Sequence, residues 1–86
     1  MKIELYTADL AKIYYAVKDH VKIPPEDDKE IYGWICKMAN LKREFNVSSI
    51  KILCNYVDEN IKNPDLIIIV NKWKTNYPCL KETFHA

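Results

Sequence analysis

A single glycine, Gly33, is present among the 86 residues of the chain. An average soluble protein contains about 7% glycine. Phosphate-binding loops, dinucleotide-binding turns and nucleophile elbows all require glycine, because their backbone adopts positive φ angles or approaches a ligand closely. The scarcity of glycine therefore excludes these sites and favours helices joined by proline, asparagine and serine.

Helical spacing of apolar residues recurs along most of the chain, and we predict an all-α fold, a compact bundle of about four short helices. We find no linker and no internal repeat, and we predict one helical domain over 1–78 with a tail at 79–86. The apolar fraction of 49% is sufficient for one small core. The predicted helices cover residues 8–22, 25–45, 48–62 and 64–77.

Helix-start signals precede each of these segments. Pro25 with the acidic residues after it, and Asn63 with Pro64, are typical of a first helical turn. Thr7 and Ser48 are the predicted N-caps of the first and third helices.

Two short stretches leave an alternative open. Residues 2–6 alternate polar and apolar side chains as a short N-terminal strand does, but five residues are too few to decide. Residues 66–70 have the composition of a buried strand, whereas the proline before them and Trp73 after them favour a helix. The central positions of the helical stripes predict a core that contains Trp34, Leu53, Val57 and Trp73.

The cysteines Cys36, Cys54 and Cys79 are odd in number and lack CxxC spacing, which argues against a disulfide framework or a zinc site. We expect a reducing, cytoplasmic location. The longest apolar run, residues 66–70, is too short to span a membrane, and no amino-terminal stretch has the pattern of a signal peptide.

Few residues are candidates for chemistry. A nucleophilic Cys36 or Cys54 paired with His20 is conceivable, but Cys54 lies on an apolar stripe. The acidic residues at 26–30 suit the positive end of a helix better than a metal ion, because consecutive helical residues point in different directions. We therefore predict no catalytic activity and no bound cofactor, metal or nucleotide.

Residues 69–74 are similar to the closing helix of the N-terminal bundle of transcription elongation factor TFIIS, a protein-docking module. With Ile50, Leu53 and Val57 upstream, the same stretch resembles the end of DnaD-type domains of replication initiation proteins. Each resemblance covers about the last third of the chain, and the Ile-Gly pair of the first family is absent. We assign the chain to neither family; both resemblances imply binding rather than catalysis.

Apolar residues also occur beside the main stripes, in pairs that project together from one helix face. Either they enclose the central helices on a second side, or they form a patch for a partner. One stripe per helix suffices for a bundle of this size, so we predict a protein-binding surface, and tyrosine suits such surfaces because it carries a polar tip on a large apolar body. The predicted surface consists of Tyr15, Tyr32, Ile52 and Tyr56.

We predict a small non-catalytic module that binds another protein, or a second copy of itself, and so recruits, regulates or inhibits a larger macromolecular machine. The size and the Lys-, Ile- and Asn-rich composition are compatible with a phage or viral accessory protein. The alternative is a nucleic-acid-binding domain of a replication or transcription factor that uses Lys72 and Lys74 beside Trp73. A net charge of +1 and a single arginine favour the first hypothesis, and no membrane partner is expected.

Overall fold

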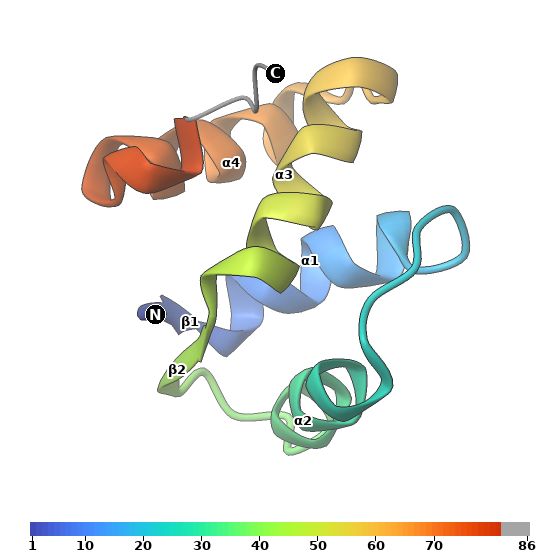
Figure 1. Cartoon of the computed structure of the whole chain (residues 1–86), viewed down its shortest axis with the longest axis vertical. Coiled ribbons are helices and arrows are strands. Elements are labelled where there is room, and N and C mark those ends of the chain that lie inside the picture. The colour runs from blue at the N-terminus through green and yellow to red at the C-terminus, as the bar shows by residue number, and fades with distance from the viewer. Residues whose placement is uncertain (82–86) are drawn as a thin grey trace.

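A computed structural model describes residues 1–81 of the chain. Two strands, four α-helices and a short 3-10 helix are present within these residues (Figure 1). In chain order they are β1 (Lys2–Tyr6), α1 (Thr7–Val17), α2 (Pro25–Ile35), β2 (Lys42–Asn46), α3 (Val47–Asn60), α4 (Pro64–Asn76) and η1 (Pro78–Lys81). The prediction of a compact domain with four helices is confirmed, but the all-α class needs correction, because a two-stranded sheet is part of the fold.

The sheet consists of β1 and β2 in antiparallel register. Ile3 lies opposite Phe45, and both side chains are buried. The strand alternative for residues 2–6 is thus confirmed, whereas the second predicted helix, 25–45, extends too far. A strand is stable only with a hydrogen-bonding partner. When that partner is not known, the sequence KREFN at 42–46 fits the last turn of a helix equally well.

The segment between α2 and β2 explains why the helix ends at Ile35. Met38 adopts a φ of 55°, which no helix accommodates, and its side chain is 95% exposed rather than part of a buried stripe. Thr7 Oγ1 donates a hydrogen bond to the carbonyl of Ala39 (2.7 Å) and accepts one from the amide of Leu41 (2.9 Å). The prediction that Thr7 is the N-cap of α1 was therefore wrong. Thr7 is the first residue of the helix, and its side chain holds this turn through two hydrogen bonds.

The remaining helix boundaries combine correct and incorrect predictions. α1 ends at Val17 instead of residue 22, and α3 begins at Val47 directly after β2, so Ser48 is not its N-cap. In contrast, α2 and α4 begin at the predicted prolines, and the Asn63 side chain accepts a hydrogen bond from the amide of Asp65 (2.9 Å). Residues 66–70 are helical, which settles the second open alternative.

The core lies between the helices and one face of the sheet. Leu53, Val57 and Trp73 are buried, as predicted. Trp34, near the end of α2, is only partly buried, and the Arg43 guanidinium lies 4.5 Å from its ring centroid. Leu80 of η1 is also buried, so the packed chain extends beyond residue 78; residues 82–86 of the predicted tail lie outside the described part.

The order strand, helix, helix occurs twice, first as β1–α1–α2 and about 40 residues later as β2–α3–α4. Glu4 and Glu44 hold the same position in the two units, and they lie directly opposite each other in the sheet. The amide of Thr7 donates to the carbonyl of Leu41 (2.8 Å), and reciprocally the amide of Val47 donates to that of Met1 (3.1 Å). The two units are thus related by an approximate two-fold axis through the sheet.

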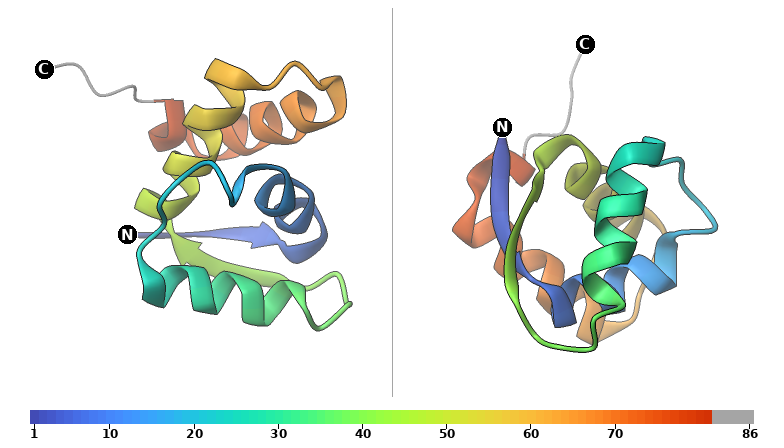
Figure 2. Two further views of the ribbon diagram at one scale, coloured as in Figure 1. Left: turned by 90° about the vertical axis from the view of Figure 1, so that its right-hand side faces the viewer. Right: turned by 90° about the horizontal axis from the view of Figure 1, so that it is seen from below.

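The arrangement of the helices agrees with this symmetry. Figure 1 shows α1 and α3 crossing in the middle of the molecule, with α2 and α4 at opposite ends. The left view of Figure 2 shows the sheet between α2 and α4. Neither unit alone covers its own apolar face, so the two units pair and form one shared core.

The prediction that the chain has no internal repeat was therefore wrong. Identical residues do occupy equivalent positions, but they are few and widely spaced, and the first helix together with the connection after it is one residue longer in the first unit. The equivalent identical pairs are Lys2 and Lys42, Glu4 and Glu44, Val17 and Val57, Pro25 and Pro64, and Trp34 and Trp73.

The two tryptophans occupy equivalent positions with different burial, which gives a direct test of the packing. We expect Trp73→Ala to lower the free energy of unfolding by about 3–5 kcal/mol, because it leaves a large cavity. Trp34→Ala should lower it by only about 1–2 kcal/mol, because that ring is partly solvated. Urea unfolding followed by far-ultraviolet circular dichroism measures both, and equal losses would contradict the assigned core.

Candidate protein-binding surface

Two of the four predicted surface residues are brought together by the packing of α1 against α2. Tyr15 and Tyr32 are 53% and 51% exposed, far more than the side chains of the core. Cys36 lies beside both phenols. Partial burial and the Cys36 thiol raise the pKa of Tyr15, and a hydrogen bond with the same thiol raises the pKa of Tyr32. The three side chains therefore form one cluster at the outer edge between the two helices.

Ile52 and Tyr56, the other two predicted surface residues, lie on α3 and are partly buried. The Tyr56 ring stacks on His20, with 5.2 Å between the ring centroids and 9° between their planes. These two residues are more covered than Tyr15 and Tyr32. The exposed part of the predicted surface is consequently on α1 and α2.

A hollow of about 340 Å³ lies between the first half of α1 and the end of α2. It is open to solvent, and the exposed Met38 lines it. Small side chains form much of its wall, so a partner could approach the helix backbones closely. The lining residues, all uncharged, are Thr7, Ala8, Ala11, Ile35, Met38, Ala39 and Asn40.

The hollow and the tyrosine cluster lie on the same helix stripes. Ala8, Ala11 and Tyr15 follow one another at helical spacing on α1, and Cys36, the C-cap residue of α2, follows Tyr32 by one turn. We call these five residues the α1–α2 face. The sequence analysis missed the two alanines, although their spacing from Tyr15 was visible, because alanine alone indicates no interaction.

The second unit shows which residues this location needs for folding. Every position of the α1–α2 face has a polar residue at its counterpart on α3 and α4. The counterparts, in the same order, are Ser48, Lys51, Asn55, Asn71 and Thr75. The fold therefore tolerates polar side chains throughout this location, and the apolar character of the first unit requires another explanation.

Gly33, the only glycine, lies on the exposed side of α2 between Tyr32 and Trp34. A Cβ atom at this position would meet nothing within 4 Å, and the backbone φ is not positive. Glycine inside a helix costs about 1 kcal/mol relative to alanine. Nothing in the packing of residues 1–81 requires this cost.

Lys72 and Lys74, the residues of the nucleic-acid alternative, are both paired with carboxylates. Lys72 Nζ lies 2.7 Å from Asp9 Oδ2, and Lys74 forms an ion pair with Asp58. Trp73 between them is buried and cannot stack on a base. The hollow of about 380 Å³ beside Lys72 is lined by charges of both signs, Glu4 and Asp9 with Lys42 and Lys72.

Two of the residues considered for catalysis, Cys54 and His20, make packing contacts. Burial raises the pKa of Cys54 from 9.0 to about 12, so this cysteine is a neutral thiol at physiological pH. His20 stacks on Tyr56. Within residues 1–81 no group of three or more metal-binding side chains gathers, and all three cysteines are free thiols.

The acidic residues at the start of α2 hold that helix against its neighbours. Asp27 accepts hydrogen bonds from Asn46 Nδ2 (2.8 Å) and from the hydroxyl of Ser49, both next to the start of α3. Asp28 accepts one from the Tyr14 hydroxyl (2.6 Å). Burial and this hydrogen bond raise the pKa of Tyr14. The acidic cluster is thus part of the packing between helices.

The chain matches no family model, no curated protein and no solved structure. None of the helices described between residues 1 and 81 combines the length and apolar character of a membrane span.

The raised pKa of Cys54 predicts a specific loss of stability at high pH. The unfolded thiol loses its proton near pH 9, whereas the folded thiol keeps it up to about pH 12. Raising the pH through this window therefore favours unfolding, by about 1.4 kcal/mol at pH 10. We expect Cys54→Val to lose that much less stability than the wild type between pH 7 and pH 10, as measured by urea unfolding under reducing conditions. Parallel losses in the two proteins would contradict the assignment.

Proposed function

We propose that this protein is a small non-catalytic module that binds another protein through the α1–α2 face, and thereby recruits, regulates or inhibits a larger macromolecular machine. The observation that carries the proposal is the contrast between the two units. Equivalent positions of the same fold are apolar or aromatic in the first unit and polar in the second. Exposed apolar residues that folding does not require are typical of an interaction surface.

The chemistry of the α1–α2 face also suits protein binding. Tyr15 and Tyr32 present large apolar rings with polar tips, and tyrosine is enriched among the residues that dominate binding energies. The alanine-lined hollow beside them provides a depression into which a partner side chain fits. Ile52 and Tyr56 remain predicted contributors, with smaller roles because they are partly buried.

Nucleic-acid binding through Lys72 and Lys74 is less well supported. Each lysine would have to leave a carboxylate before it could contact a phosphate. The size and composition of the chain remain compatible with a phage or viral accessory protein, a hypothesis on which the geometry has no bearing.

The proposal is tested by affinity capture from cells of the source organism with three forms of the protein. These are the wild type, the double variant Tyr15→Ala/Tyr32→Ala and the matched control Asn55→Ala/Asn71→Ala. We expect the wild type and the control to retain the same partner, and the tyrosine variant to lose it, since truncating a central tyrosine often costs about 2 kcal/mol of binding. Circular dichroism should show that all three forms fold.

A salt series separates the two hypotheses. Docking on an apolar face should weaken only slightly between low and high salt, whereas phosphate binding should weaken steeply. Equal capture by all three forms, or a steep salt dependence, would contradict the proposed function.

A further inference from the structure

The secondary structure of the α1–α2 face restricts the kind of segment that can dock on it. Both elements are helices, whose interior amides and carbonyls bond within the helix, and the amide of Ala8 at the start of α1 donates to Asn40 Oδ1 (3.2 Å). An extended peptide gains its affinity from the free backbone groups of a strand edge, which this face does not offer. A helical segment satisfies its own backbone hydrogen bonds and needs only an apolar groove.

Small residues set how close such a helix can lie. Ala8 and Ala11 line the hollow, and the distance between packed helices depends on the side chains at their contact. Tyr15 and Tyr32 are larger and half-exposed, so they present their rings to the partner. A third helix on this face would pack as the helices of a small bundle do.

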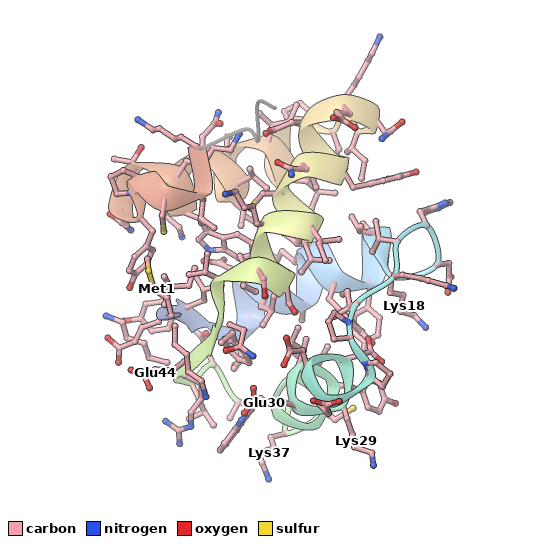
Figure 3. The ribbon with its side chains drawn as sticks, in the orientation of Figure 1. Met1, Lys18, Lys29, Glu30, Lys37 and Glu44 are labelled. Atoms are coloured by element: carbon pink, nitrogen blue, oxygen red, sulfur yellow. The ribbon has the colours of Figure 1, made fainter. Side chains whose placement is uncertain are left out.

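Charges occur at one end of the α1–α2 face. Lys18, the C-cap residue of α1, is three residues after Tyr15, and Lys29 is three residues before Tyr32 on α2. Figure 3 shows both lysines pointing outward from the molecule. Lys29 forms no ion pair within residues 1–81, and Lys18 lies 3.8 Å from the exposed Asp19, a weak pair.

The opposite end of the face is neutral, because every residue that lines the hollow is uncharged. Asp19 and Asp28 also lie one helical turn from Tyr15 and Tyr32. Asp19 is beside Lys18, and Asp28 accepts a hydrogen bond from the Tyr14 hydroxyl, so Lys29 is the charge at the lysine end that has no ion pair within residues 1–81. A partner that complements this pattern places its apolar side chains along the face and its negative charge at the lysine end.

From this, the geometry points to one occupant: an amphipathic helix of another protein, whose apolar stripe covers the α1–α2 face and whose carboxylates lie beside Lys18 and Lys29. This inference rests on the proposed function and adds the chemistry of the partner. A second copy of the chain is a poorer occupant, since its own α1–α2 face brings lysines rather than carboxylates to the contact.

Two display libraries test the inference, one of surface-randomised helices on a stable helical scaffold and one of unstructured linear peptides. Both are selected on the folded wild-type protein and counter-selected on Tyr15→Ala/Tyr32→Ala. Affinities of the selected binders are then measured with the wild type, with Lys18→Glu/Lys29→Glu and with the control Lys62→Glu, an exposed lysine of the second unit.

We expect the helical library to yield binders with apolar residues at i, i+3 or i+4, and i+7, and acidic residues near one end. Reversal of both lysine charges should weaken these binders about tenfold, and Lys62→Glu should leave their affinity unchanged.

The remaining outcomes overturn the inference in distinguishable ways. If only linear peptides bind the face, or if the affinity of the helical binders is unchanged by Lys18→Glu/Lys29→Glu, the inference of a helix with carboxylates is wrong and the proposed function stands. If neither library yields binders that depend on Tyr15 and Tyr32, both proposals fail. If sedimentation velocity shows that the wild type forms dimers and Tyr32→Ala does not, the occupant is a second copy and the helix inference is wrong.

Discussion

The antiparallel pairing of β1 with β2 is the interaction on which the other contacts of the fold depend. It places Glu4 opposite Glu44, at equivalent positions of the two units, and so establishes the two-fold relation between them. The amides of Thr7 and Val47, the first residues of α1 and α3, are bonded to carbonyls of the opposite unit. Each strand thus positions the first helix of its own unit and part of the other unit. Neither strand would persist alone, because a five-residue strand without a partner is not stable in water.

The two units use this common frame differently. Asp27 and Asp28 attach α2 through hydrogen bonds, whereas their counterparts Leu66 and Ile67 are apolar residues of α4. α2 buries only Ile31 and Ile35, and α4 buries Leu66, Ile69, Val70 and Trp73. Polar attachment of α2 leaves more of its apolar surface free. The exposed Tyr32 and the glycine beside it are consistent with a helix that keeps one side available for a partner.

Helical periodicity and the proline starts predicted most of α1, α3 and α4, the start of α2, and buried residues such as Leu53 and Trp73. Local patterns could not reveal β2, because Phe45 continues a helical stripe and its strand pairing depends on residue 3, far away in sequence. The helix after Ser48 needed no side-chain cap, since the strand leads directly into it. Tyr15 and Tyr32 were predicted as surface residues from their off-stripe positions. Their contact with Cys36, and the hollow beside Ala8 and Ala11, depend on tertiary packing that periodicity does not report.

The central claim is that Tyr15 and Tyr32 serve a partner and that the fold does not need them. The most direct measurement is the free energy of urea unfolding of Tyr15→Asn/Tyr32→Asn, which gives the first unit the residues that occupy these positions in the second. The account predicts a change within about 1 kcal/mol of the wild type, as for substitutions of exposed residues. A loss of about 3 kcal/mol or more would show that the tyrosines belong to the core, and would contradict the account.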